Sequence, residues 1–317
     1  MISLPKLSDF NLTGKRVIVR ADLDISPEDI NNIRLTSLSQ TLDYLKNQNA
    51  LITIIGHRGR PQGLDESLSL KPFEQYFKKW EARVLENLRF DEREEKNDES
   101  FAKELSAGQD FYVNEAFGVS HREHASIVGL PKLLPHAAGF RFVSEIENLS
   151  KVLENPQRPL IFIISGLKDD KLSYMESFLK LSDKILIGGR MPDYIHDDSP
   201  LRHNEKVVVA DLLPDKEDIT IHSIEKFETE IIKSKTIVVS GPIGKFEEEG
   251  HRQGTSRVFF NVTNSNSFKI AGGGDTETAI NLLNLKDKFN WISVGGGAML
   301  EFLAKGTLPG IVSLLEK

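Results

Sequence analysis

Two patterns of apolar residues alternate along the whole chain. Short runs rich in Val, Ile and Leu have the length of buried strands, and the first two are Arg16–Arg20 and Leu51–Ile55. Between them, the leucines of residues 35–45 recur at helical spacing. Strands that alternate with helices predict α/β units built on mostly parallel sheets, with ligands at the carboxyl ends of the strands.

The same alternation continues to the C-terminus. Further strands are predicted at Arg83–Leu85, Phe111–Val113, Leu160–Ile164, Lys184–Ile187, Lys206–Ala210, Ile219–His222, Thr236–Val239, Ser267–Ile270 and Trp291–Val294. Helices are predicted over residues 101–105, 139–155, 171–181, 225–233, 276–283 and 298–304. The acidic run Asp91–Glu99 predicts a solvated loop.

At 317 residues and 39% apolar, the chain is too long for one ordinary core. The long helix before Pro156 and Pro159 is the candidate connector. We therefore predict an α/β fold of two doubly wound parallel-sheet domains, residues 1–140 and 159–304, joined by a helix over 141–158. Residues 305–317 form an apolar tail, with the first domain as a candidate surface for it.

Composition narrows the class of protein. The formal net charge of -7 argues against a general nucleic-acid binder but permits a local basic pocket. The absence of cysteine removes disulfides, thiolate catalysis and cysteine metal sites. No apolar run approaches the roughly 20 residues of a membrane span, and residues 1–10 lack a signal-peptide core. A cytoplasmic protein is expected.

Basic side chains follow several of the predicted strands. Taken singly, each is more often a solvated surface charge. Together they predict a cage for a small anion that carries phosphate and carboxylate, because arginine contacts both groups in a bidentate manner. These residues are Arg34, His57, Arg60, Arg89, His121 and Arg122.

Two triple-glycine runs, Gly272–Gly274 and Gly295–Gly297, each separate a predicted strand from a predicted helix. Glycine at such a junction lets backbone N–H groups approach a ligand, and the helix N-terminus behind it favours a phosphate. The alternative is that these glycines serve only the close packing of strand and helix. Two such runs in neighbouring units favour a phosphate site.

An ordered series of motifs resembles phosphoglycerate kinases over nearly the whole chain. The motifs are Val19–Asp24, Asn31–Arg34, Gly56–Pro61, Glu86–Phe90, Val113–His124 (with Glu115 in place of an Asp), Ser165–Lys168, Gly241–Glu247, Gly272–Asp275 and Gly295–Ala298. The resemblance implies two domains that close about a hinge helix. It also implies reversible phosphoryl transfer between 1,3-bisphosphoglycerate and ADP, which gives 3-phosphoglycerate and ATP.

The resemblance also implies roles for single residues. The triose would be held by Asp22, Asp24, Arg34, His57, Arg60, Arg89 and Arg122. The nucleotide would be held by Lys168, Lys171, Pro242, Glu247, Gly272, Gly273, Gly274, Asp275 and Thr276, with Mg²⁺ on Asp275. Catalysis by positioning and charge would rest on Arg34, Lys168, Gly273 and Gly296. Partners would be small molecules, without nucleic acid or membrane, and the chain would be a monomer.

Several positions depart from the family pattern. Asp24 and Ser240 each stand where asparagine is expected, and Lys171 follows Lys168 by three residues instead of four. The chain is also short between Gly189 and Ser234, near the expected adenosine pocket. These departures leave two alternatives: a non-catalytic binding or regulatory protein on the same scaffold, and a kinase for another acyl phosphate or phosphate donor. A coupled assay with 3-phosphoglycerate, ATP and Mg²⁺ separates a working enzyme from the non-catalytic alternative, and assays with polyphosphate or other nucleotides test the second alternative.

Overall fold

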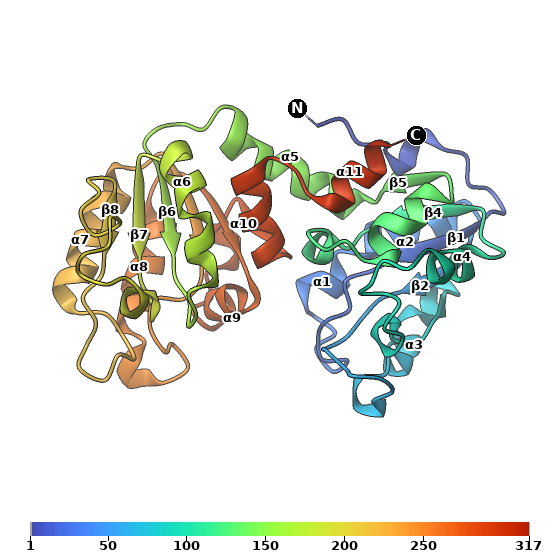
Figure 1. The fold of residues 1–317 in the computed structure, drawn as a ribbon, viewed down its shortest axis with the longest axis horizontal. Coiled ribbons are helices and arrows are strands. Elements are labelled where there is room, and N and C mark those ends of the chain that lie inside the picture. The colour runs from blue at the N-terminus through green and yellow to red at the C-terminus, as the bar shows by residue number, and fades with distance from the viewer. Residues whose placement is uncertain (1, 317) are drawn as a thin grey trace. The chain divides into compact units, whose positions relative to one another are not determined.

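The computed structural model describes residues 2–316, which fall into two compact units. One unit runs to Glu147 and takes in the C-terminal residues from Thr307 onward, and the other spans Asn148–Gly306. The boundary after Glu147 falls inside helix α5 (Phe140–Glu154), so this helix belongs in part to each unit. Figure 1 shows a sheet with packed helices in each unit.

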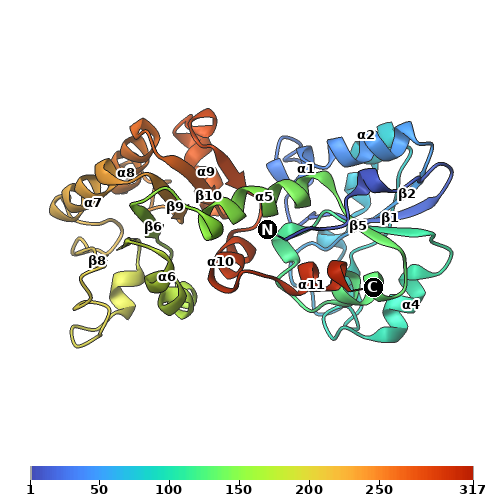
Figure 2. The same ribbon diagram turned by 90° about the horizontal axis from the view of Figure 1, so that it is seen from above.

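The first unit is built on a five-stranded parallel sheet with the order β3-β2-β1-β4-β5. Its strands are β1 (Arg16–Arg20), β2 (Leu51–Ile55), β3 (Arg83–Val84), β4 (Phe111–Asn114) and β5 (His136–Ala138). Helices lie on both faces of the sheet (Figure 2). One face carries α1 (Ile33–Thr36) and α2 (Ser39–Asn47), and the other carries α4 (Glu99–Ser106) and α11 (Pro309–Leu315). Helix α3 (Glu74–Phe77) shares one core cluster with α1 and α2.

The second unit is built on a six-stranded parallel sheet with the order β11-β10-β9-β6-β7-β8. Its strands are β6 (Leu160–Ile164), β7 (Lys184–Ile187), β8 (Val207–Val209), β9 (Thr236–Ser240), β10 (Phe268–Gly272) and β11 (Trp291–Ser293). One face carries α7 (Ile221–Lys233), α8 (Gln253–Asn264) and α9 (Gly274–Leu282), and the other α6 (Met175–Leu181) and α10 (Gly296–Lys305). The predicted fold class is confirmed.

The central strands explain why the sequence patterns were clear. Every residue of β6 and of β9 is buried, and β1 exposes only Arg16. A parallel sheet with helices on both faces has no solvated side, so its strands become continuous apolar runs instead of alternating ones. The apolar runs in the sequence are therefore the cores of the two units.

Three local predictions were wrong. Residues 219–222 are not a strand, because the Thr220 side chain accepts from Ser223 N and so starts α7 at Ile221. The helix predicted from the leucines of residues 35–45 divides into α1 and α2. The acidic run Asp91–Glu99 is not uniformly solvated, since Glu94 is completely buried and accepts two hydrogen bonds from Ser126. β5 and α8 were not predicted.

The C-terminal segment packs in the first unit through α11. Gly310 N donates to Ser120 O at 2.9 Å, and the Ser313 hydroxyl donates to Ile127 O at 3.1 Å. A Cβ on Gly310 would lie 2.7 Å from Ser120 Cβ, so this approach requires glycine. No single helix within residues 2–316 is long and apolar enough to cross a membrane, although α10 and α11 reach that length and composition together.

Glu115 caps the N-terminus of α5 from the loop that follows β4. Its carboxylate accepts from Arg141 N at 3.3 Å and Phe142 N at 3.0 Å, and the Thr41 hydroxyl donates to it. Burial raises the pKa of Glu115 to about 7, against the three donors and the Arg141 charge, which lower it. One titratable group thus supports the start of the helix that the two units share.

Replacing Glu115 with glutamine should change how stability depends on pH. A carboxyl group whose pKa is higher in the folded protein than in the unfolded chain stabilises the fold when it is protonated. This stabilisation is complete below the pKa of the unfolded chain and disappears as the pH rises through the pKa of the folded protein. From about pH 4.5 to about pH 7, wild type should lose about 3 kcal/mol of unfolding free energy relative to Glu115→Gln. Urea unfolding across this range measures it. A constant difference between the two proteins would contradict the assignment.

Candidate active site

The ends of four parallel strands bring the basic loops of the first unit together. Residues after β1, β2, β3 and β4 line one cavity of about 290 Å³. Its lining is Asp22, Asp24, Arg34, His57, Arg60, Arg89, Glu95, Gly118, Val119, His121, Arg122 and His124. All seven residues assigned to the triose lie in this cavity, at the sheet edge where ligands of such folds bind.

Hydrogen bonds fix the acidic and basic groups on one side of the cavity. Arg34 Nη1 donates to Asp24 O at 3.1 Å and lies 3.6 Å from Asp22 Oδ1. The Asn32 side chain accepts from Arg34 N and caps α1. The Asp24 carboxylate accepts from Gly59 N at 2.7 Å, so it anchors the loop that follows β2. The Arg34 guanidinium is therefore held in place before any ligand binds.

Arg89 is held from two directions. Its Nη1 donates to Gly59 O at 2.7 Å, and its Nε lies 3.0 Å from Glu95 Oε1. Asn87 accepts from Arg89 N and also bonds the main chain of Arg58, which ties the loops after β2 and β3 together. The acidic residues around Glu95 predicted a solvated loop. No sequence signal indicated that Glu95 lines the cavity.

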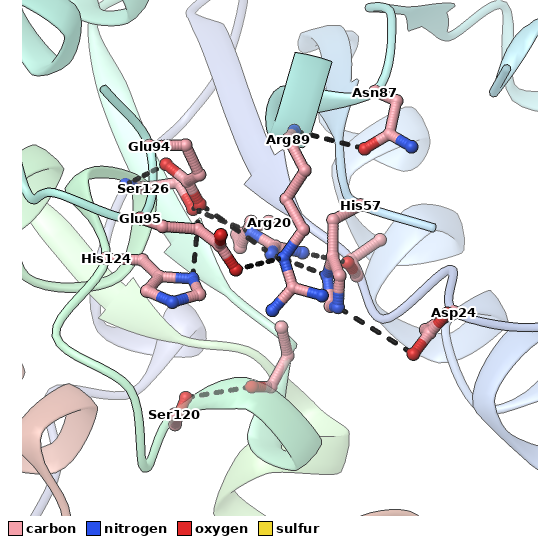
Figure 3. Close-up of polar contacts among 12 residues, drawn as sticks. Arg20, Asp24, His57, Asn87, Arg89, Glu94, Glu95, Ser120, His124 and Ser126 are labelled. Atoms are coloured by element: carbon pink, nitrogen blue, oxygen red, sulfur yellow. Dashed lines mark hydrogen bonds and ion pairs between the residues drawn. The ribbon is translucent and has the colours of Figure 1, made fainter. Parts of the chain in front are cut away.

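A buried polar network that the sequence did not reveal adjoins the cavity, and two of its members, His57 and His124, also line it (Figure 3). Arg20, Glu94 and Ser126 are fully buried, and His57 and His124 are nearly so. Arg20 contacts His57 and Ser126, while Glu94 bonds Ser126 and lies 3.8 Å from His124. Burial first, and then the nearby charges of Arg20 and Arg89, lower the pKa of His124 to about 3. His124 is therefore neutral at ordinary pH.

In the second unit, the two glycine runs lie against each other at the ends of β10 and β11. Gly273 adopts φ +112°, a region that favours glycine. A Cβ on Gly296 would lie 2.6 Å from Gly273 Cα, closer than backbone atoms allow. The first helical residues are Gly274 in α9 and Gly296 in α10. Both helices thus begin within the glycine runs, an arrangement that favours a bound phosphate.

Two of the side chains assigned to the nucleotide are bound to the main chain. The buried Thr276 hydroxyl accepts from Gly241 N at 2.8 Å and donates to Gly272 O at 3.0 Å. Lys171 Nζ donates to Ser165 O and to Ser240 O. Burial lowers the pKa of Lys171 to about 8, with Asp170 and Asp275 acting in the opposite direction. Both side chains hold together the loops that follow β6, β9 and β10.

The remaining nucleotide candidates differ in exposure. Lys168, Glu247 and Asp275 are exposed, while Pro242 is half-buried and its carbonyl accepts from the Ser165 hydroxyl. No group of three or more His, Asp or Glu side chains in residues 2–316 could hold a metal ion. Asp275 could therefore hold Mg²⁺ only together with oxygens from elsewhere, such as phosphate or water.

Ser240 and the shortened region lie in well-bonded parts of the second unit. Ser240 is buried, and its carbonyl accepts from Ser165 N at 2.8 Å as well as from Lys171. Asp218, in the shortened region, is buried and accepts from Gly254 N at 2.8 Å, near the start of α8. A Cβ on Gly254 would lie 2.2 Å from the Asp218 carboxylate. The contact between Asp218 and Gly254 ties the segment between β8 and α8 to the start of α8.

Comparison with known proteins decides the family. The family model described as phosphoglycerate kinase matches residues 7–84, 75–197 and 193–306. The chain belongs to the phosphoglycerate kinase family. A phosphoglycerate kinase from Finegoldia magna is 35% identical over 390 residues, covering 98% of this chain and 99% of the relative. That alignment is longer than this chain, so the relative carries residues that this chain lacks.

Solved phosphoglycerate kinase structures share the architecture. The structure from Coxiella burnetii matches with a TM-score of 0.83 at 28% identity, covering 99% of both chains. The structure from Pyrococcus horikoshii matches with a TM-score of 0.85 at 25% identity, covering 98% of both chains. The resemblance inferred from the motifs is confirmed across both units.

Proposed function

We propose that this chain is a phosphoglycerate kinase, which transfers a phosphoryl group reversibly between 1,3-bisphosphoglycerate and ADP to give 3-phosphoglycerate and ATP. The observation that carries the proposal is a cavity of the first unit that all seven predicted triose residues line. Family membership over both units supports it. No observation favours the non-catalytic alternative.

The triose would bind in the cavity through its phosphate and carboxylate. Arg60, Arg89 and Arg122 supply cations, and His57 a further polar group. Asp22 and Asp24 accept hydrogen bonds, so they suit a hydroxyl of the ligand. Arg34, held by Asp24 and facing Asp22, would stabilise the charge of the transferring group.

The nucleotide would bind at the glycine runs of the second unit. The N–H groups of Gly272–Gly274 and of Gly296 would face its phosphates, and the exposed Lys168 would neutralise their charge. Pro242 and Glu247 would contact the nucleoside. Thr276 and Lys171 would keep the turns in shape through their main-chain contacts. Asp275 would hold Mg²⁺, which neutralises charge on the phosphate oxygens when bound.

No covalent intermediate or strong base is required, because phosphoryl transfer depends on positioning and charge. Transfer requires both ligands to meet, and we propose that the units close about α5 to achieve this and to exclude water. We also propose that the chain acts as a cytoplasmic monomer on small molecules; its net charge of -7 argues against a general nucleic-acid partner.

A coupled assay with 3-phosphoglycerate, ATP and Mg²⁺ tests this function. The proposal predicts saturable turnover in both substrates. Binding of both ligands without turnover would instead support a regulatory protein. Turnover only with another acyl acceptor or phosphate donor would support a related kinase.

Replacing Asp24 with asparagine should strengthen triose binding. The amide oxygen can still accept from Gly59 N, while a negative charge beside an anionic substrate is removed. At this partly exposed site the charge costs about 1 kcal/mol, so KM for 3-phosphoglycerate should fall about fivefold. The exposed Asp287→Asn, in the other unit, controls for net charge. An unchanged or higher KM in Asp24→Asn would show that the carboxylate contributes favourably to binding.

A further inference from the structure

Arg20, the last residue of β1, is fully buried although it does not line the cavity. A buried guanidinium is costly unless most of its donors are bonded. Its Nε donates to the Ser126 hydroxyl at 2.8 Å, its Nη1 to Ala21 O at 2.6 Å, and its Nη2 contacts His57 Nδ1 at 3.0 Å. All three nitrogens of the guanidinium therefore have a protein partner.

Glu94 and Ser126 hold Arg20 in this orientation. The Glu94 carboxylate accepts from Ser126 N at 2.9 Å and from the Ser126 hydroxyl at 2.5 Å, and it lies 4.0 Å from Arg20 Nη2. Ala125 N donates to Glu94 O, and the Tyr112 hydroxyl donates to Ser126 O. The buried cation thus has a buried counter-charge that is itself fixed by hydrogen bonds.

The contact with Arg20 determines which nitrogen of His57 carries the proton. A guanidinium can only donate, so His57 Nδ1 must accept and cannot be protonated. The proton of the neutral ring must then be on Nε2, which lies 3.9 Å from Asp24 Oδ2. Figure 3 shows the ring between these two groups, with Nδ1 toward Arg20 and Nε2 toward Asp24. The other tautomer would place two donors face to face.

The charges around His57 oppose its protonation. Arg20, Arg34 and Arg89 are the cations near it, His124 is a neighbouring neutral histidine, and Asp24 is the nearby carboxylate. Burial and then these cations lower the pKa of His57 well below its ordinary value. The His57 ring therefore stays neutral at the pH values at which a free histidine begins to take up a proton.

We propose that Arg20 is a positioning residue, which holds His57 as the neutral Nε2–H tautomer so that it donates a hydrogen bond to the anion in the cavity. Glu94 and Ser126 serve this role by aligning Arg20. The anion is the triose if the proposed function is correct, and to this extent the inference rests on that function. The state of the His57 ring in the free protein does not depend on it.

Nitrogen NMR of the full chain tests the inference directly. The His57 signals are assigned by comparison with His57→Gln, and the ring is followed from about pH 5 to about pH 8. Wild type should show the Nε2–H tautomer throughout. Arg20→Met should show a mixture of the two neutral tautomers, because the contact that excludes a proton from Nδ1 is lost. Its KM for 3-phosphoglycerate should rise about tenfold with little change in kcat, because a contact present in both the ground state and the transition state is weakened.

Two further variants separate positioning from general damage to the fold. Arg16→Met removes the arginine at the other end of β1, which pairs with Asp110 at the surface, and should leave the His57 signals unchanged. Arg20→Lys keeps one donor and should restore the wild-type tautomer in part; it replaces Arg20→Met if that variant does not fold. An Nδ1–H tautomer in wild type, or an unchanged ring in the Arg20 variants, would overturn the inference. The expected tautomer without any turnover would instead count against the proposed function.

Discussion

Arg34→Ala is expected to lower kcat for phosphorylation of 3-phosphoglycerate about 1000-fold while the chain remains folded. Arg34 lines the cavity, and its guanidinium is already positioned by Asp24 O and by the Asp22 carboxylate. A cation fixed in advance stabilises the charge of a migrating phosphoryl group without reorganisation. Its removal therefore affects the transition state more than the binding of substrate.

The control for this variant is Arg83→Ala. Arg83 is an exposed arginine of β3 in the same unit, and it does not line the cavity. It should keep wild-type kcat and KM. Arg34→Lys should recover only part of the loss, since an ammonium lacks the planar geometry for bidentate contacts. Retention of more than about a tenth of kcat in Arg34→Ala would show that another group carries the charge stabilisation.

Gly296→Ala is expected to lower the unfolding free energy of the second unit by about 2 to 3 kcal/mol and to weaken nucleotide binding at least tenfold. The added Cβ would lie 2.6 Å from Gly273 Cα, and a backbone atom cannot move aside as a flexible side chain can. The two glycine runs would have to separate, which moves the N–H groups that we assign to the phosphates.

Gly274→Ala is the matched control for stability. A Cβ on Gly274 meets no atom within 4 Å, and the residue lies in the first turn of α9. Alanine at this position should leave the unfolding free energy within about 1 kcal/mol of the wild-type value or raise it slightly. Urea unfolding and titration with ATP measure both effects. Equal stability of Gly296→Ala and Gly274→Ala would mean that the close approach of the two runs is not needed.

The sequence predicted those features that depend on local pattern. The strands β1, β2, β6 and β7 have the bounds predicted from the sequence, because a strand covered on both faces is mostly a continuous apolar run. The seven triose residues could be grouped because the carboxyl ends of parallel strands meet at one edge of a sheet. Neither inference required knowledge of distant contacts.

What the sequence did not predict depends on contacts between distant residues. Glu94 lies in an acidic run that is otherwise mostly solvated, and only the fold brings it to Arg20, 74 positions earlier in the chain. Lys171 follows a glycine-containing loop as a nucleotide-binding lysine would, yet its ammonium contacts Ser165 O and Ser240 O. α7 starts at Ile221 because of a single threonine cap in a segment of β-branched residues. Contacts of these kinds leave no periodic pattern in the sequence.

The most direct test of the account is transfer of the labelled γ-phosphoryl group of ATP to 3-phosphoglycerate, compared among wild type, Arg34→Ala and Lys168→Met. Arg34 and Lys168 belong to different units, and the account requires both for one transfer. It predicts that wild type forms labelled acyl phosphate only when 3-phosphoglycerate and Mg²⁺ are both present. Each variant should lose transfer while it still binds the ligand of the unaffected unit. Wild type that binds both ligands yet transfers no label, or label transfer that survives in both variants, would contradict it.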